Sequence, residues 1–268
     1  MGKVRVNGVE LHYVEAGSGD PLLLIMGFGG DHLAWAFQVP VFSERYRVIT
    51  FDNRGAGQSS VPDVPYTTRM MADDAVGLLD ALEIERAHVL GVSMGGMIAQ
   101  ELAMNHPRRV RSLQLHCTYA RPDAYMLALM ETWRAVRAKA TLEEWMRTVA
   151  LWLFSPKTYR ERPEFIETII QTALASPHPF TAMGFLRQGD AVRSHDALAR
   201  LSALACPTLV SVAEDDVLVP PRFARELAAA IPGAALRLID GAGHAYFWER
   251  PDIFNAMCLD FVAKHARV

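Results

Sequence analysis

His88-Val-Leu-Gly-Val-Ser-Met-Gly-Gly-Met97 is the stretch of sequence that decides the fold of this chain. An apolar lead-in runs into Gly91-Val92-Ser93-Met94-Gly95, and a helix-like segment follows. That order predicts a strand, a sharp turn and a helix, the arrangement called a nucleophile elbow. The turn holds its serine in strained backbone geometry, so small residues must flank it. The helix start then offers free backbone N–H groups and a positive dipole end to a developing negative charge.

The same pentapeptide could also be a glycine-rich turn that only packs closely. The functional interpretation therefore depends on the rest of the chain. It requires an acidic residue and a histidine that follow Ser93 in the right order.

Composition favours a large globular domain with a full core. The chain has 268 residues and is 51% hydrophobic, and a chain of this size buries roughly three quarters of its unfolded surface. Its net charge of −3 and pI near 6.3 argue against a nucleic-acid or membrane partner. Cys117, Cys206 and Cys258 form no close pair, which is typical of core thiols in a reducing compartment. With no secretory signal and no long apolar run, we expect a cytoplasmic protein.

Strand and helix patterns alternate along the chain on both sides of the elbow. An Asn7-Gly8 turn between two alternating runs predicts an N-terminal hairpin. Short apolar runs predict buried strands, and amphipathic spacing predicts helices, which together indicate an α/β fold with a mainly parallel sheet. The predicted strands are 21–26, 47–51, 110–116, 207–213 and 235–240, and the predicted helices are 33–42, 68–82, 221–230 and 252–264.

The alternation stops between residues 119 and 196. This segment is helix-like, rich in tryptophan, methionine and phenylalanine, and punctuated by prolines, and it contains no linker or repeat. We therefore expect residues 1–118 and 197–268 to form the core domain, with 119–196 as a helical insertion that lies over the sheet.

The acid and the histidine follow where the alternation resumes. Glu214-Asp215-Asp216-Val-Leu-Val-Pro220 comes after one predicted strand, and Gly241-Ala-Gly-His244 comes after the next. A serine hydroxyl is a weak nucleophile at neutral pH, so a neutral imidazole must take its proton. A carboxylate must in turn hold that imidazole in the right tautomer. Asp215 and Asp216 are adjacent, so only one of them can face the histidine.

Motifs in this order resemble those of the α/β-hydrolase superfamily. The resemblance rests on 26–30, 52–59, 91–95, 216–220 and 243–244, and it covers nearly the whole chain outside the insertion. It implies Ser93 as nucleophile, His244 as general base and Asp216 as acid, with the insertion as a cap. Finer details are similar to serine esterases and lactonases, including 3-oxoadipate enol-lactonases.

One position departs from that family's pattern. Many members carry His-Gly before the oxyanion residue, where this chain has Met26-Gly27. The backbone N–H of Phe28 should still donate to an oxyanion, with a second donor at Met94. A substrate pocket is expected at Gly27 and at the insertion's tryptophans, Trp133, Trp145 and Trp152, although tryptophans in such a segment can equally form its own core.

Two further features have a structural and a functional interpretation. The loop from Asp52 to Ser59 lacks a P-loop lysine, so a turn that fixes the core is favoured over a phosphate or metal loop, with Arg54 tying loops together. His32 follows the oxyanion turn and could line the pocket or lie on the surface.

These features predict a serine hydrolase that needs no cofactor or metal and cleaves a carboxylic ester, lactone or enol-lactone of small, hydrophobic character. The insertion is expected to set substrate choice and to contribute little to the chemical step. Hydrolysis of a carbon–carbon bond in vinylogous diketones is an alternative, because it uses the same residues. A ligand receptor with slow turnover on the same fold is another, and the rate of turnover distinguishes it.

Overall fold

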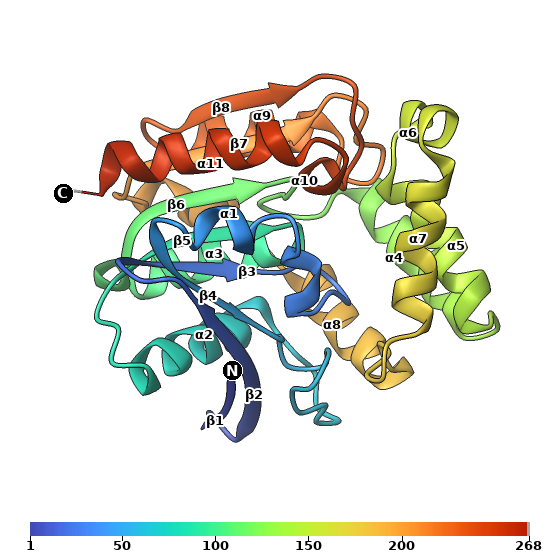
Figure 1. Cartoon of the computed structure of the whole chain (residues 1–268), viewed down its shortest axis with the longest axis horizontal. Helices are drawn as coiled ribbons and strands as arrows, with labels where there is room; N and C mark the ends of the chain where they lie inside the picture. The colour runs from blue at the N-terminus through green and yellow to red at the C-terminus, as the bar shows by residue number, and fades with distance from the viewer. Residues whose placement is uncertain (267–268) are drawn as a thin grey trace.

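An eight-stranded sheet forms the centre of the computed structural model, which describes residues 1–266 (Figure 1). Its spatial order is β1-β2-β4-β3-β5-β6-β7-β8. β1 and β2 are antiparallel, and the other strands run parallel to one another. The strands are β1 (Gly2–Val6), β2 (Val9–Ala16), β3 (Asp20–Ile25), β4 (Tyr46–Phe51), β5 (Ala87–Val92), β6 (Val110–His116), β7 (Thr208–Ala213) and β8 (Ala235–Ile239).

Two hydrophobic cores cover the two faces of this sheet. Successive residues of a strand point to opposite faces, so Leu23 and Ile25 of β3 enter one core while Leu22 and Leu24 enter the other. Helices α2 (Thr68–Ala81), α3 (Met94–Asn105) and α9 (Pro221–Ala230) close the first core. Helices α1 (Val39–Phe42), α10 (Tyr246–Glu249) and α11 (Pro251–His265) close the second. The mainly parallel α/β fold predicted from the sequence is confirmed.

The N-terminal hairpin forms as its turn chemistry predicts. Asn7 and Gly8 both have positive φ angles, 47° and 78°, which is the conformation of the two-residue hairpin turn that asparagine and glycine favour. Val6 pairs with Val9 across it. The predicted helix at 33–42 is wrong as a single element. A short 3-10 helix spans His32–Trp35, and α1 begins separately at Val39, because Pro40 lacks an N–H and fits only a first helical turn.

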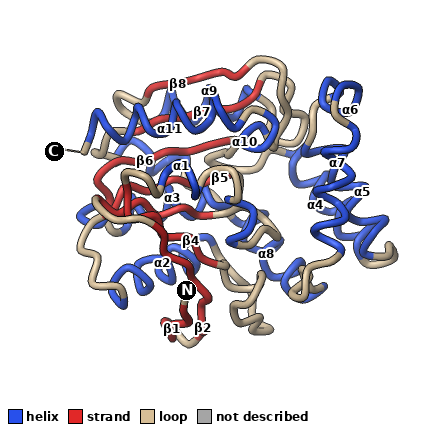
Figure 2. Tube along the Cα trace, viewed as in Figure 1, coloured by secondary structure: helices blue, strands red, loops and turns tan. Residues whose placement is uncertain are grey.

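Residues 119–196, here called the helical segment, contain no strand (Figure 2). Their helices are α4 (Ala124–Arg137), α5 (Leu142–Leu153), α6 (Pro156–Glu161), α7 (Pro163–Leu174) and α8 (Ala182–Ser194). Side-chain caps begin α4, α5, α6 and α8 at Asp123, Thr141, Ser155 and Thr181. The segment leaves and re-enters the core at one place, because Ala197 N donates to Ala120 O over 2.8 Å.

The carboxyl ends of the parallel strands point toward the helical segment in Figure 1. Two short 3-10 helices, Pro107–Arg109 and Leu198–Ala203, complete the connections. Within residues 1–266, no helix is both long and apolar enough to span a bilayer. Loops that follow parallel strands meet at one edge of the sheet, so residues far apart in sequence come together there.

Candidate active site

Ser93 occupies a strained turn between β5 and α3. Its φ of 56° and ψ of −121° lie outside the regions that non-glycine residues favour. A Cβ on Gly91 would lie 2.2 Å from Gly95 O, and a Cβ on Gly95 would lie 2.0 Å from Ile25 O. Both contacts are with backbone, which cannot move aside as a flexible side chain can. The glycines therefore allow the strand, the turn and the helix to approach, and Ser93 is left partly exposed at the sheet edge.

Asp216 and His244 lie together at the same edge, after β7 and β8. His244 Nδ1 and Asp216 Oδ2 are 2.8 Å apart, and both side chains are buried. The other carboxylate oxygen accepts the backbone N–H groups of Leu218 and Val219 at 2.9 and 2.8 Å. Asp215 is exposed instead. The carboxylate is thus held by the turn that follows β7 and faces the imidazole.

Ser93 lies at the same edge of the sheet but is not hydrogen-bonded to His244 among the described residues. In the part of the chain that the structure describes, no hydrogen bond joins the Ser93 hydroxyl to the imidazole, whereas Ser93 N donates to His116 O at 2.9 Å. Hydrogen bonds between nucleophile and base are often long in ligand-free enzymes and tighten when substrate binds.

The turn after β3 lies directly against Ser93. A Cβ on Gly27 would lie 2.9 Å from Ser93 Cβ and 3.5 Å from its Oγ, so only glycine allows this approach. Gly30 N donates to Gly27 O at 3.2 Å and Gly29 has a φ of 74°, the features of a type II turn with Phe28 at its second position. Met94 begins α3, so its N–H has no partner within the helix.

The predicted pocket tryptophans contact one another through Trp133. Trp133 meets Trp145 with ring centroids 5.5 Å apart and Trp152 at 6.3 Å. Trp145 then meets Phe185 at 5.1 Å, and Phe185 meets Phe28 at 5.2 Å. A chain of aromatic contacts therefore connects these tryptophans to the turn beside Ser93. The phenylalanine links were missed from the sequence, because nothing local distinguishes them from other apolar residues of the segment.

Glu249 is a second residue that the sequence did not indicate. It is a buried carboxylate in α10. One oxygen accepts Gly243 N at 2.5 Å, and the other accepts the N–H and hydroxyl of Ser155 at 2.9 and 2.8 Å and also the Thr158 hydroxyl. Gly243 precedes His244, so Glu249 ties the histidine loop to the start of α6. Its partners come from distant parts of the chain, and no local signal marks it.

Cys117 lies beside the acid and the imidazole. Its Sγ is within 4.8 Å of a carboxylate oxygen of Asp216 and of a ring nitrogen of His244, and all three residues are buried. Burial raises the pKa of the thiol well above its usual value, and the Asp216 charge raises it further. The thiol is therefore neutral here. Its position after β6 could have revealed it, because the carboxyl edge gathers such residues.

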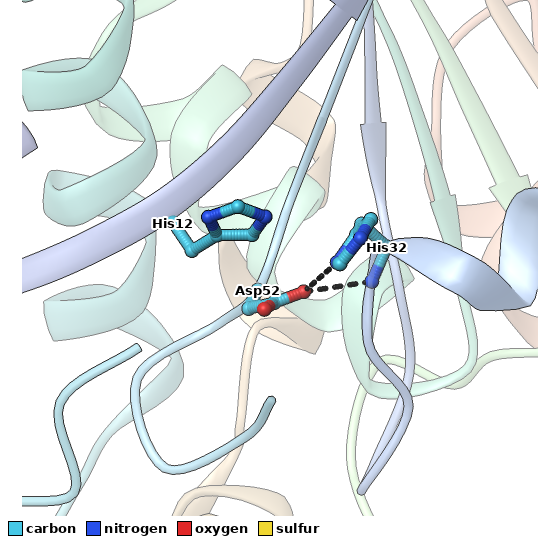
Figure 3. A group of neighbouring side chains, drawn as sticks. All are labelled: His12, His32 and Asp52. Atoms are coloured by element: carbon cyan, nitrogen blue, oxygen red, sulfur yellow. Dashed lines mark hydrogen bonds and ion pairs between the residues drawn. The ribbon is translucent and has the colours of Figure 1, made fainter. Parts of the chain in front are cut away.

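His12, His32 and Asp52 form a second cluster (Figure 3). One ring nitrogen of each histidine and a carboxylate oxygen of Asp52 lie within 4.8 Å of one another. His32 Nδ1 and Asp52 Oδ1 are 2.8 Å apart, and His32 N also donates to that oxygen at 2.8 Å. The Asp52 hydrogen bond raises the pKa of His32 despite opposing burial. Burial raises the pKa of Asp52, but hydrogen bonds from His32 and from Gln58 N outweigh it, so the net shift is downward. Within the cluster, His32 and Asp52 are thus hydrogen-bonded to each other, and the imidazole nitrogen that faces Asp52 is already engaged.

The remainder of the 52–59 loop is bound to the core, as expected for a structural turn. Asn53 Nδ2 donates to Met26 O at 2.8 Å. Arg54 forms a buried ion pair with Asp74 through contacts of 2.5 and 2.6 Å. The Asn53 contact ties this loop to the residue before Gly27, and the Arg54–Asp74 pair ties it to α2.

A groove of about 700 Å³ lies elsewhere, at the junctions of the helical segment with the core. It is lined by charged side chains that include Arg121, Arg193 and Arg222 and by none of Ser93, Asp216 and His244. Arg222 is already paired with Asp123 at 2.7 Å. This groove is therefore separate from the site at the sheet edge.

Comparisons with known sequences and structures all indicate one protein family. Residues 20–251 match the family model described as alpha/beta hydrolase fold. A putative carbamate hydrolase, RutD, of Azorhizobium caulinodans is 33% identical over 252 residues, which cover 94% of each chain. A putative non-heme bromoperoxidase, BpoC, of Mycobacterium tuberculosis is 36% identical over 95% of this chain and 98% of its own. The crystal structure of the enol-lactonase from Burkholderia xenovorans superposes with a TM-score of 0.88 at 29% identity, covering 98% of this chain and 100% of that one.

Proposed function

This chain belongs to the α/β-hydrolase family, and we propose that it is a cofactor-free serine hydrolase that cleaves carboxylic esters, lactones or enol-lactones. The observation that carries the proposal is the geometry at the sheet edge. Ser93 is held in the strained elbow, and the buried Asp216–His244 pair lies at that same edge. Strain at a single polar residue in such a place is a mark of a functional site.

In the proposed first step, Ser93 Oγ attacks the substrate carbonyl carbon while His244 takes the hydroxyl proton through Nε2. Nδ1 of His244 is 2.8 Å from Asp216 Oδ2, which supports Nδ1 as the protonated nitrogen and leaves Nε2 free to accept. The carboxylate then stabilises the imidazolium that forms.

The negative charge that develops on the carbonyl oxygen is assigned to the N–H groups of Phe28 and Met94. The Phe28 N–H has no acceptor within residues 1–266, and that of Met94 lies at the positive end of α3. Donors set in place before the reaction cost no reorganisation when the charge appears. His244 next protonates the leaving alkoxide, and then activates a water molecule that hydrolyses the acyl-Ser93 ester.

The helical segment is proposed as the cap, with Gly27, Trp133, Trp145 and Trp152 close to the bound substrate. Its aromatic residues continue to Phe28, which supports a preference for apolar acyl chains or rings. The indole N–H of Trp133 is buried and has no acceptor among the described residues. A substrate oxygen would satisfy it.

A substrate panel separates this proposal from its alternatives. An aryl ester, a lactone, a carbamate and a dienone acid present the four bond types raised by the sequence and by the relatives. Hydrolysis of the ester and lactone with many turnovers supports the proposal. Preference for the dienone acid would indicate carbon–carbon hydrolysis, and one reaction per protein molecule would indicate a receptor.

The direct test is labelling with a fluorophosphonate, followed by mass spectrometry of the modified peptide. An adduct on Ser93 is expected, and Ser93→Ala should remain unlabelled. Modification of another residue, or none in a folded and active protein, would refute the assignment of Ser93.

A further inference from the structure

Gln188 connects the helical segment to the turn beside Ser93. Its side chain is fully buried. Oε1 accepts the N–H of Gly29 at 2.9 Å, and Nε2 donates to Arg54 O at 2.9 Å. One amide therefore satisfies a donor and an acceptor in two core loops, although Gln188 itself belongs to α8.

The close approach of α8 makes these bonds possible. A Cβ on Gly184 would lie 2.0 Å from Gly55 O, so the helix backbone rests on the loop that carries Arg54. Gly184 and Gln188 are four residues apart and share one face of the helix. Gly184 thus brings that face against the core, and Gln188 reaches across it.

The ring of Phe28 is held by the same part of the chain. Phe180 and Phe185 meet it edge-on at centroid distances of 5.4 and 5.2 Å. Phe180 directly precedes the cap residue of α8, and Phe185 lies within the helix. Gln188 therefore holds the backbone after Phe28, and Phe180 and Phe185 hold the Phe28 ring.

The Gly29 N–H is the group that distinguishes two forms of this turn. In a type II turn the central peptide is rotated by about half a turn relative to type I, and the N–H of the third residue points the other way. An acceptor on Gly29 N therefore selects one orientation of the Phe28–Gly29 peptide. That orientation fixes the ψ angle of Phe28, whose own N–H is the proposed oxyanion donor.

We propose that Gln188 is a positioning residue for the oxyanion hole, so that α8 contributes to the chemical step as well as to substrate choice. This inference rests on the proposed serine hydrolase function. It departs from the expectation that residues 119–196 have little part in the chemistry. Movement of α8 away from the core would free the Gly29 N–H and release the turn.

The test compares Gln188→Met, which removes both hydrogen bonds at similar volume, with Gln188→Glu, which keeps an acceptor for Gly29 N and, in its protonated form, a donor for Arg54 O. Gln100→Met is the matched control. Gln100 is also fully buried and also bridges elements, through Nε2 to Tyr119 O at 3.0 Å, but it does not touch the turn. Gln188→Asn, which is too short to reach both loops, repeats the test if the methionine variant does not fold.

With p-nitrophenyl butyrate, we expect Gln188→Met to lower kcat by about 10- to 100-fold, less than the 10²–10³ of deleting a donor itself. KM should change by less than about threefold, because the donor acts mainly on the transition state. The inhibition constant of butylboronic acid, which mimics the tetrahedral state, should rise by the same factor as kcat falls. Gln188→Glu should recover most of the loss, and Gln100→Met should lower Tm and leave kcat unchanged.

A kcat within about threefold of wild type in Gln188→Met, or an equal loss in Gln100→Met, would overturn the inference. Fluorophosphonate labelling of the wild-type protein separates the two proposals. If Ser93 is labelled and the kinetic prediction fails, only the role of Gln188 is wrong. If Ser93 is never labelled, the proposed function itself is wrong.

Discussion

The elbow around Ser93 and the helical segment are built by different physical means. At the elbow, backbone meets backbone, and a single methyl on Gly91 or Gly95 would lie closer than 2.5 Å to a main-chain oxygen. In the helical segment, aromatic side chains meet at centroid distances of 5.1 to 6.3 Å. Its helix α8 meets the core backbone closely at Gly184, but a Cβ on Gly189 would make only an ordinary contact, 4.0 Å from Phe28 Cε2. The backbone contacts at Gly91 and Gly95 leave room for glycine alone, whereas contacts between side chains allow more than one combination of residues.

This difference suggests a division of roles. A site that must hold reacting atoms within a fraction of an ångström requires the rigid construction of the sheet edge. A surface that selects among substrates benefits from side chains whose shape can change without loss of the fold. Gln188 and Glu249 are two of the residues through which the helical segment is hydrogen-bonded to the core.

The largest expected effect is that of Ser93→Ala. Loss of the nucleophile in such a triad lowers the rate by about 10⁶, and the fold should be unchanged because the backbone of the elbow remains. Ester hydrolysis and circular dichroism of the purified variant are the measurements. Activity within tenfold of wild type would mean that the rigid region is not where the chemistry occurs.

Next comes Asp216→Asn, with Asp215→Asn as its control. Losing the carboxylate that orients the imidazole should lower kcat by about 10³ to 10⁴. The exposed Asp215 should change kcat only a few-fold. The two carboxylates are adjacent and differ mainly in whether they face His244, so the opposite ranking would show that the acid is assigned to the wrong residue.

A pair of glycine substitutions tests the contrast between the two regions directly. Gly95→Ala places its methyl 2.0 Å from Ile25 O, and we expect destabilisation at or above the upper end of the ~1–3 kcal/mol typical of overpacking. In Gly189→Ala, inside α8, the new Cβ would lie 4.0 Å from Phe28 Cε2. It should stabilise the fold by about 0.5–1 kcal/mol, since alanine is the better helix former. Urea denaturation measures both, and equal effects would remove the distinction.

Substitutions at the tryptophans should have a smaller and different effect. A pocket distinguishes a methylene by about 1–3 kcal/mol, so at least one of Trp133→Ala, Trp145→Ala and Trp152→Ala should shift the ratio of kcat/KM between butyrate and octanoate esters by roughly 10-fold or more. Trp133→Phe keeps an aromatic ring at this position and removes the unpaired indole N–H. If all of these variants lower Tm and leave the substrate profile unchanged, the tryptophans form only the core of the segment.

The smallest effect is expected from His32→Gln, and it should depend on pH. The pKa of His32 is raised and that of Asp52 is lowered in the folded state. The ion pair therefore stabilises the fold most between the ordinary aspartate and histidine pKa values, about 3.9 and 6.5. The contribution of His32 declines as pH rises through its folded pKa, and that of Asp52 declines as pH falls through its own.

Urea denaturation of wild type and His32→Gln at pH 6 and pH 9 checks this dependence. The difference in unfolding free energy should be larger at pH 6. A difference that is constant or larger at pH 9 would show that the pair does not act through charge. His12→Gln is a useful control, because burial lowers the pKa of that neighbouring ring, so its effect should not be larger at pH 6 than at pH 9.

The order of strands and helices could be predicted from the sequence because it depends on local rules. Apolar runs, amphipathic spacing and turn residues identify the elements, and all bounds of α9 and β6 agree with the prediction. The elbow was predictable for the same reason, since close backbone approach demands glycine at fixed offsets from Ser93. The region from 33 to 42 was not, because Pro40 restarts the helix within an otherwise helical pattern.

Motif order and family resemblance supplied Ser93, Asp216 and His244 as candidates, and the fold decided how they lie. That Asp216 rather than Asp215 faces the imidazole follows from the direction of the turn after β7. Gln188 reaches Gly29 and Glu249 reaches Ser155 across separations of 159 and 94 residues. A side chain's hydrogen-bond partner at such a separation depends on how helices pack on the sheet, and no local pattern of residues encodes it.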